Sequence, residues 1–298
     1  MRSNASAPPL LVALWGLSHG AMAFSLLGPF KTWQILQIGY NETGDIGGPM
    51  SLGEEYRWNT PVITYAYDQS FLLYFGARGV QDIEAAAQIF NNIPPVSQMS
   101  PTLAEFSQTA KGVPVQQAAT LGVLDLKSFA MRMMVEELGL AEAERWVYAL
   151  RARTIMGTPP VTNYTVIQLN FDPVTLRPTN VINGVLYSQY IIREFQNPNE
   201  AIALRVPSSS PTTVSRNSSV AGGVPLPGEY YIGLSRDDIG GLRYLLRPNN
   251  YNVEQIAPGS FVVFTNRNAV QPLSTIDLHT FLTDTANTTN TPADLQAL

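Results

Sequence analysis

The clearest structural pattern in the sequence lies in residues 125–140, which read Asp125-Leu-Lys-Ser-Phe-Ala-Met-Arg-Met-Met-Val-Glu-Glu-Leu-Gly139-Leu140. The spacing of the apolar residues is typical of an amphipathic helix of about four turns. Asp125 stands where an N-cap belongs, because its carboxylate accepts from free N–H groups of the first turn. Gly139 stands where a helix ends, because glycine adopts the left-handed conformation that closes many helices. The sequence therefore predicts a central helix here.

The same stretch resembles the active-site helix of the metzincin metallopeptidases, in particular their matrixin-like branch. That helix reads Asp-Leu-x-Ser-x-Ala-x-His-Glu-x-x-His-x-Leu-Gly-Leu, with a third His three residues after the Gly. The positions that match in register are Asp125, Leu126, Ser128, Ala130, Leu138, Gly139 and Leu140. Every position that carries chemistry in the family is changed.

The resemblance places five residues at the altered site: Arg132, Met133, Glu136, Gly139 and Glu142. Two His four residues apart on a helix hold a zinc ion, and the Glu between them takes a proton from zinc-bound water. Arg132 stands at the first ligand position, and an Arg has no lone pair to offer a metal. Met133 replaces the general base, while Glu136 and Glu142 replace the second and third ligands. The resemblance thus implies no zinc, no cofactor and no catalytic residue, with Arg132 and Glu136 as an i,i+4 ion pair.

Residues 234–248 supply a second resemblance, since Leu-Ser-Arg-Asp-Asp-Ile-Gly-Gly-Leu-Arg-Tyr-Leu-Leu is similar to the C-terminal helix of the matrixin-like domain. Ser235 is predicted to be the N-cap. The carboxylates of Asp237 and Asp238 then lie in the first turn, where they favour the positive end of the helix. The predicted packing face consists of Ile239, Leu242 and Leu246.

The third resemblance lies nearer the N-terminus. Residues 57–68 alternate in polarity and are rich in aromatic residues, which predicts a strand, and residues 80–92 have helical spacing. Matrixin-like domains begin with a Trp, a strand ending in Thr-Tyr and a helix with Ala-x-x-x-Phe. The residues in that order here are Trp58, Thr64, Tyr65, Ala86 and Phe90.

The expected fold is α/β (α+β) of metzincin type: a small twisted mixed sheet with an N-terminal helix, the central helix and an inserted β-hairpin. Residues 24–55 are expected to be an irregular Gly-rich segment leading into a domain over 56–248. Within that domain, 142–153 are predicted to be a helix that buries Trp146, Ala149 and Leu150. Strands near 161–169 and 181–192 are predicted to form the inserted hairpin, and 206–223 a mobile loop. Residues 249–298 are expected to be an extension with one strand at 261–264 and a disordered tail.

The first 23 residues have the composition of a secretory signal peptide. Arg2 gives a positive start, residues 10–17 are apolar, and Ala21-Met22-Ala23 is a cleavage site before Phe24. The apolar run is too short to span a bilayer, so no integral membrane span is expected after cleavage. The sequence predicts export to the periplasm, cell envelope or extracellular space.

The amino-acid composition excludes several kinds of site and partner for the predicted exported chain. The 298 residues contain no Cys, which excludes disulfides and suits a bacterial envelope or secreted protein. Loss of Arg2 leaves 17 of the 18 basic residues against 23 acidic ones, a net charge of −6, which argues against nucleic acid as a partner. His279 is then the one remaining His, so a three-His zinc site is excluded within the chain.

Three functions remain open from the sequence. The first is a non-catalytic, metallopeptidase-like protein that binds a peptide or protein segment, with Arg132 as a contact for a carboxylate. The second is a structural cell-envelope protein with no binding groove. The third is a hydrolase that uses carboxylates such as Glu136, Glu137 and Glu142 without zinc. A binding function requires Arg132 to lie in an open groove. A structural function predicts that Arg132 is buried or covered. Carboxylate catalysis requires acidic side chains that converge in a pocket without Arg132 between them.

Overall fold

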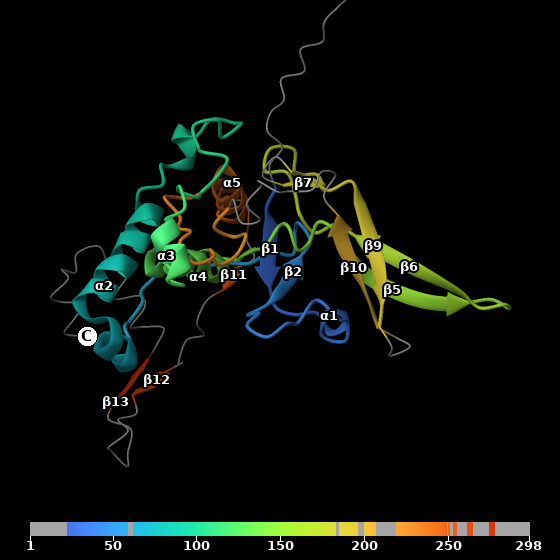
Figure 1. The fold of residues 1–298 in the computed structure, drawn as a ribbon, viewed down its shortest axis with the longest axis horizontal. Helices are drawn as coiled ribbons and strands as arrows, with labels where there is room; N and C mark the ends of the chain where they lie inside the picture. The colour runs from blue at the N-terminus through green and yellow to red at the C-terminus, as the bar shows by residue number, and fades with distance from the viewer. Residues whose placement is uncertain are drawn as a thin grey trace, which may run out of the picture.

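The computed structural model describes residues 23–58, 62–182, 185–195, 200–206, 219–248 and 250, together with three short strands beyond them. Over this part of the chain the fold is mixed α/β, as predicted, with small, mostly antiparallel sheets and few helices (Figure 1). The predicted single twisted mixed sheet is wrong for these residues. A three-stranded sheet and five two-stranded sheets take its place, because most of the strands are short and several pair only with the next strand along the chain. None of the described helices is long and apolar enough to cross a membrane.

The central helix, α4, lies near the middle of the chain, with helices and strands on both sides of it in sequence. The helices are α1 (Thr32–Ile35), α2 (Gln69–Asn91), the 3₁₀ turn η1 (Val96–Gln98), α3 (Gln116–Thr120), α4 (Leu126–Glu137) and α5 (Arg236–Leu245). The strands up to α4 are β1 (Ser25–Gly28), β2 (Gly48–Met50) and β3 (Arg57–Trp58). Those after it are β4 (Leu140–Ala141), β5 (Ala149–Met156), β6 (Val161–Ile167), β7 (Val181–Ile182), β8 (Val185–Leu186), β9 (Gln189–Glu194), β10 (Ala201–Val206), β11 (Val253–Glu254), β12 (Phe261–Phe264) and β13 (Ser274–Asp277).

The segment 24–55 is not irregular, because it supplies two strands of the three-stranded sheet. β1 lies in the middle, antiparallel to both β2 and β4, and Leu26 pairs with Met50 on one side and Leu140 on the other. The short apolar run Phe-Ser-Leu-Leu at its start has the composition of a strand buried on both faces. The β1–β4 pairing therefore places Leu140, just after the central helix, next to Leu26 near the beginning of the described chain.

The central helix α4 begins and ends where the sequence predicts. The Asp125 carboxylate accepts from the Ser128 backbone N–H at 2.9 Å, and Gly139, just after the helix, has φ +101°. Met131 and Val135 are fully buried on the inner side, and α2 packs along the helix. The four-residue spacing of these two side chains explains why this face is the one that packs.

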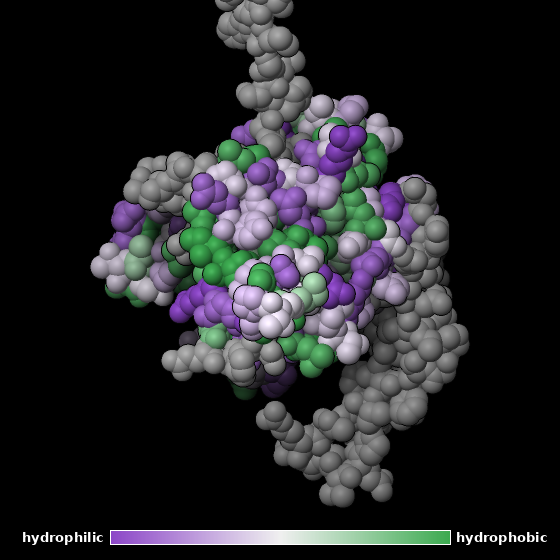
Figure 2. All heavy atoms as spheres, turned by 90° about the vertical axis from the view of Figure 1, so that its right-hand side faces the viewer, coloured by the Kyte–Doolittle hydropathy of each residue, from purple (hydrophilic) through white to green (hydrophobic). Residues whose placement is uncertain are grey.

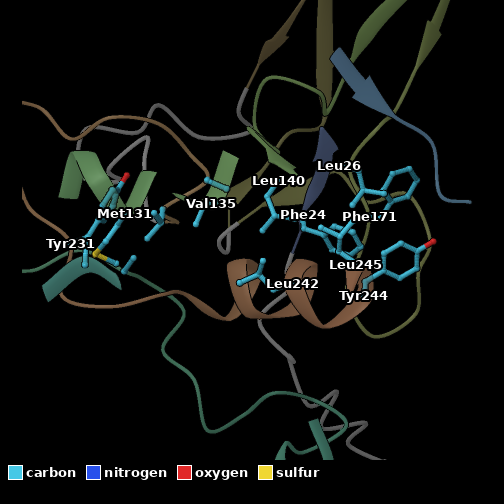
Figure 3. Close-up of a cluster of buried hydrophobic side chains, with 14 of the residues drawn as sticks. Phe24, Leu26, Met131, Val135, Leu140, Phe171, Tyr231, Leu242, Tyr244 and Leu245 are labelled. Carbon is cyan, nitrogen blue, oxygen red and sulfur yellow. The ribbon is translucent and has the colours of Figure 1, made fainter. Parts of the chain in front are cut away.

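The core lies between α4, the three-stranded sheet and α5 (Figure 3). Its labelled members are Phe24, Leu26, Met131, Val135, Leu140, Phe171, Tyr231, Leu242, Tyr244 and Leu245. Ser235 caps α5 as predicted, in a capping box with Asp238. The predicted packing residue Leu246 is wrong: it is 48 % exposed beyond the last turn, and Leu245 is buried instead. Ile239 and Leu242 are buried as predicted.

The predicted strand over 57–68 is limited to β3, two residues long. β3 pairs in parallel with β11, in the register Arg57 to Val253 and Trp58 to Glu254. Residues 62–67 follow without assigned secondary structure, and Val62, Ile63 and Tyr65 are exposed. Alternating polarity predicted a strand, but no described strand lies beside 62–67 to accept its backbone hydrogen bonds.

The predicted helix over 142–153 is wrong, because Ala149–Met156 is strand β5. It pairs with β6, with Ala149 opposite Ile167 and Met156 opposite Val161. Trp146, Ala149 and Leu150 are all buried as predicted. The buried residues were therefore identified correctly, but their spacing was wrongly interpreted as that of a helix. A hairpin partner supplied by the next segment overrides the helical spacing.

The predicted pairing of 161–169 with 181–192 is wrong as well. β6 pairs with β5, β7 with β8, and β9 with β10. The two longer hairpins, β5–β6 and β9–β10, form the part of the molecule that extends to the right in Figure 1. Of the predicted loop 206–223 the structure describes Val206, which ends β10, and residues 219–223, where Val220 and Ala221 are buried in the core. Residues 1–22 of the predicted signal peptide, His279 and the predicted tail lie outside the described residues.

Gly139 gives a direct test of the turn after α4. A Cβ at this position would lie 3.1 Å from Leu245 Cδ2, on a backbone with φ +101°. We expect Gly139→Ala to destabilise the protein by about 1–2 kcal/mol, because alanine is strained at positive φ. Urea unfolding of Gly139→Ala beside Gly53→Ala, at a glycine with φ +88° and open space around it, measures the effect of the contact. Equal losses in the two variants would contradict a packed turn.

Candidate functional site at the end of the central helix

Three residues of the altered site meet on one nitrogen atom. Arg132 Nη2 forms an ion pair with Glu136, one turn further along α4, and lies 3.3 Å from Oε1 of Glu142. We call these three side chains the ion triad. The positions that correspond to the three metal ligands of the resembled family are thus brought together, although Glu142 lies ten residues from Arg132.

The turn at Gly139 makes this meeting possible. The Gly139 N–H donates to the Glu136 carbonyl at 2.8 Å, and the Gly139 carbonyl accepts from the Leu27 N–H at 2.8 Å. β4 then runs along β1, with Leu140 paired to Leu26. The chain therefore turns back at the end of α4, and Glu142 returns to the level of Arg132.

Burial sets the electrostatics of the ion triad. The Arg132 side chain is 8 % exposed, the Glu136 side chain 26 % and the Glu142 side chain 34 %. Burial raises the pKa of the Glu136 carboxyl above its ordinary value, although the neighbouring Arg132 acts in the opposite direction. Two further Arg132 donors, Nε and Nη1, are buried and have no hydrogen-bond partner among the described residues. The guanidinium is therefore a covered charge, balanced by two carboxylates of its own chain.

The ion triad does not fit a zinc ion. A cation occupies the point where the ligands would converge, and it has no lone pair to donate. No cluster of three His, Cys, Asp or Glu side chains suited to a metal occurs in the described part of the chain. Met133, at the general-base position, is 51 % exposed and takes no part in the triad. Arg132 also lies between Glu136 and Glu142, which opposes a carboxylate acid/base pair at this site.

Two buried hydrogen-bond networks that no sequence pattern predicted lie near the triad. The Ser128 hydroxyl of α4 accepts from the Tyr231 N–H at 2.7 Å, and the Tyr231 hydroxyl donates to the Gly223 carbonyl. Asp238 of α5 accepts from the N–H groups of Val220 and Ala221, both at 2.9 Å. The two networks join α4, α5 and the chain around 219–231. The paired Asp237 and Asp238 were the available signal, but only the fold shows that Asp238 is buried.

A shallow hollow of about 480 Å³ lies away from the triad, between the two long hairpins. Its lining residues are Tyr148, Val166, Ile167, Gln168, Pro178 and Tyr190. The Tyr148 hydroxyl donates to the Tyr187 carbonyl at 2.9 Å, and the rings of Tyr148 and Tyr190 lie 5.1 Å apart. No sequence pattern indicates this hollow, because its residues come from separate strands and loops.

The raised pKa of Glu136 predicts a pH dependence. A carboxyl whose pKa is higher in the folded state stabilises the fold most below its unfolded pKa of about 4.3, and this contribution is lost as pH rises through the folded value. We therefore expect the stability of the wild type relative to Glu136→Gln to fall as pH rises from about 4. Urea unfolding at a series of pH values measures this difference, and a pH-independent difference would contradict the prediction.

Glu54 provides a control of opposite sign. Burial alone would raise the pKa of the Glu54 carboxyl, but hydrogen bonds from Lys31 and Ser51 hold it below the ordinary value. Its contribution is present above the unfolded pKa and is lost as pH falls. The stability of the wild type relative to Glu54→Gln should therefore rise with pH over the same range.

The structure thus unites Arg132, Glu136 and Glu142, uses Gly139 as the turn that unites them, and leaves Met133 exposed. The predicted ligand contact at Arg132 requires an open groove, and the covered guanidinium does not meet that condition. Comparisons of the chain with models of protein families, with curated proteins and with solved structures find no match.

Proposed function

We propose that the protein is an exported, metallopeptidase-like protein that does not cut peptides and acts by binding a protein segment. The observation that carries the proposal is the ion triad, in which a guanidinium stands where the resembled family holds its metal. The convergence of Arg132, Glu136 and Glu142 after the Gly139 turn supports the resemblance, because those are the positions of the three ligands. Their chemistry supports loss of the reaction.

Metal content tests the first half of the proposal. Purified protein should contain no stoichiometric zinc by mass spectrometry, and its melting temperature should be the same with and without a chelator. The physical reason is that a buried Arg repels a cation at the only point where the three side chains meet. Stoichiometric zinc with a melt that the chelator lowers would overturn the proposal.

Arg132 is not the binding contact in this proposal, because it is covered and already paired. The hollow between the hairpins suits the role better, since two Tyr rings and Pro178 form an apolar, aromatic floor with Gln168 as a polar group. Figure 2 faces this end of the molecule and shows apolar side chains gathered among hydrophilic ones. Exposed apolar residues on the hairpins include Ile155, Val161, Tyr190 and Ile191. Such a surface fits an extended, apolar segment.

Selection of displayed peptides on the purified protein, followed by titration calorimetry, tests the binding. Tyr190→Ala should weaken the selected peptides at least tenfold, because it removes a ring from the hollow. Tyr56→Ala is the matched control, since Tyr56 is 42 % exposed, Tyr190 is 45 % exposed, and Tyr56 lies outside the hollow. Equal affinity in wild type and Tyr190→Ala would place binding elsewhere and contradict the assignment of the hollow.

A structural envelope protein is the second candidate, and the burial of Arg132 favours it. In that role the ion triad only connects α4 to the chain that follows β4. The two candidates separate in the same experiment, because a purely structural protein would select no peptide whose binding depends on Tyr190.

A further inference from the structure

Strand β6 has one edge with which no described strand pairs. Its other edge is bonded to β5 along the whole strand, from Ile167 opposite Ala149 to Val161 opposite Met156. In the described part of the chain, no further strand pairs with β6 and no backbone hydrogen bond joins it to another segment. Because each residue of a strand carries an N–H and a C=O group, this outer edge presents a row of donors and acceptors to a further strand.

The outer edge of β6 also lacks the residues by which proteins usually protect an edge. Charged side chains and prolines within an edge strand oppose pairing with another chain. β6 reads Val-Thr-Asn-Tyr-Thr-Val-Ile and contains neither. The other described strands of six residues or more, β5, β9 and β10, each contain at least one Arg. The absence of charge is therefore specific to β6 among the longer described strands.

The β5–β6 hairpin carries this edge away from the core. The turn between the two strands lies at the far right of Figure 1, at the end of the part formed by the two longer hairpins. Ile155, Met156 and Val161, which flank the turn, are 53 %, 62 % and 57 % exposed. Ile167, at the opposite end of β6, is partly buried. A second chain therefore reaches the outer edge without displacing any core residue.

The order of residues in β6 suits pairing with a second copy of the same strand. Two identical strands that overlap fully in antiparallel directions place Tyr164 on the two-fold axis, opposite its own copy. Aromatic and β-branched cross-strand pairs stabilise a sheet, whereas like charges opposite each other destabilise it. All other pairs in this register are uncharged. They are Asn163 with Thr165, Thr162 with Val166, and Val161 with Ile167.

The charges beside the centre of this register are already paired within one chain. Arg153, opposite Tyr164 on β5, forms an ion pair at 2.8 Å with Glu194 of β9. The Tyr164 hydroxyl donates to the same Glu194 carboxylate. Arg153 and Glu194 thus neutralise each other, and they do not repel the same two residues of a second copy.

Full overlap also covers the exposed apolar residues at the turn. Val161 at the outer end of one β6 lies opposite Ile167 at the inner end of the other. Val166 and Ile167 line the hollow between the hairpins. Each turn therefore lies beside the hollow of the second copy, and apolar side chains that face water in one chain lose part of that exposure in the pair.

From the outer edge, its lack of charge and its self-complementary register, we propose that the protein forms a homodimer in which β6 pairs antiparallel with β6 of a second copy. The same edge of each copy meets the other, so the interface closes at two chains. About seven backbone hydrogen bonds join the copies, roughly one for each residue of the strand. The contact involves two strands and two turns, which is small for a dimer interface, so the dimer is reversible.

Sedimentation equilibrium on the full chain tests the dimer. The wild type should pass from monomer to dimer as its concentration rises. The double variant Asn163→Lys with Thr165→Lys places Lys opposite Lys at two points of the register, and it should weaken dimerisation by at least about tenfold. Gln117→Lys with Thr120→Lys is the matched control, because it adds the same charge at exposed positions of α3, and it should dimerise as the wild type does.

Cross-linking locates the contact, and the absence of Cys from the chain makes the added thiols unique. Asn163→Cys places two thiols close to the two-fold axis, so a short bis-maleimide should link two chains. Thr154→Cys is the control, since Thr154 is exposed and lies opposite Asn163 on β5. Its two copies are separated by three strand spacings, about 14 Å, and should stay unlinked. Equal linking in both variants would place the contact elsewhere.

Three results would overturn the proposal. The first is a wild type that stays monomeric at every concentration. The second is a dimer that the two Lys residues leave intact while the melting temperature is unchanged. The third is a monomer whose selected peptides lose affinity in Asn163→Lys with Thr165→Lys, because that result would assign the outer edge to an extended segment of another protein. Loss of the dimer together with the fold is recognised by a lowered melting temperature, and the cross-links of the otherwise unaltered chain then decide.

Discussion

Arg132→Met should destabilise the protein by about 3 kcal/mol, because it leaves two partly buried carboxylates without their counter-charge. The Glu136 and Glu142 carboxylates both face Arg132 Nη2 and are 26 % and 34 % exposed, so water screens them only in part. Met retains much of the length of the Arg stem, which keeps the loss of packing small. Urea unfolding at pH 7 measures the change, and the metal content of the variant shows whether zinc enters once the cation is gone.

Two further variants make the result interpretable. Lys31→Met breaks the Lys31–Glu54 pair, in which both side chains are 38–40 % exposed, and should cost at most about 0.5 kcal/mol. The double variant Glu136→Gln with Glu142→Gln leaves the covered guanidinium with no counter-charge, and it should destabilise the protein at least as much as Arg132→Met. A loss in Arg132→Met no larger than in Lys31→Met would show that the ion triad behaves as an ordinary surface pair.

Asp238→Ala should cost about 4 kcal/mol, because it leaves several buried donors without an acceptor. The Asp238 carboxylate accepts from three backbone N–H groups, those of Val220, Ala221 and Ser235, and from the Ser235 hydroxyl. The residue is 1 % exposed, so water does not replace these bonds without entering the core. Thermal and urea unfolding measure the loss of stability, and hydrogen exchange at 219–223 should rise with it.

Asp125→Ala separates this effect from ordinary helix capping. Asp125 caps α4 through the Ser128 N–H and hydroxyl and is only partly buried, so its removal should cost about 1 kcal/mol. The excess in Asp238→Ala is then the contribution of the tether between α5 and the chain at 220–221. Similar losses in both variants would contradict a tether and reduce Asp238 to a cap.

The helix ends were predictable because their causes are local. Asp125, Ser235 and Gly139 act on groups within a few residues, through a cap hydrogen bond or a positive φ, and the structure confirms all three. Burial was also predictable where size and polarity decide it, as at Trp146 and Leu150. The strand at 57–68 and the helix at 142–153 failed for one reason. A strand exists only where another segment accepts its hydrogen bonds, and short windows of sequence do not show the partner.

For the candidate site, too, some properties were predictable from the sequence and others were not. The sequence alone shows that Arg132, Glu136 and Glu142 stand where the resembled family has its metal ligands, and that an Arg among them does not suit zinc, because lone pairs and charges belong to the side chains. That the three side chains meet and that the guanidinium is covered follows from the folded chain and not from the sequence pattern. The β1–β4 pairing brings Glu142 back to the end of α4, and packing around the helix removes Arg132 from water. Contacts between residues distant in sequence depend on the whole fold, so the exposure of Arg132 depended on the fold as well.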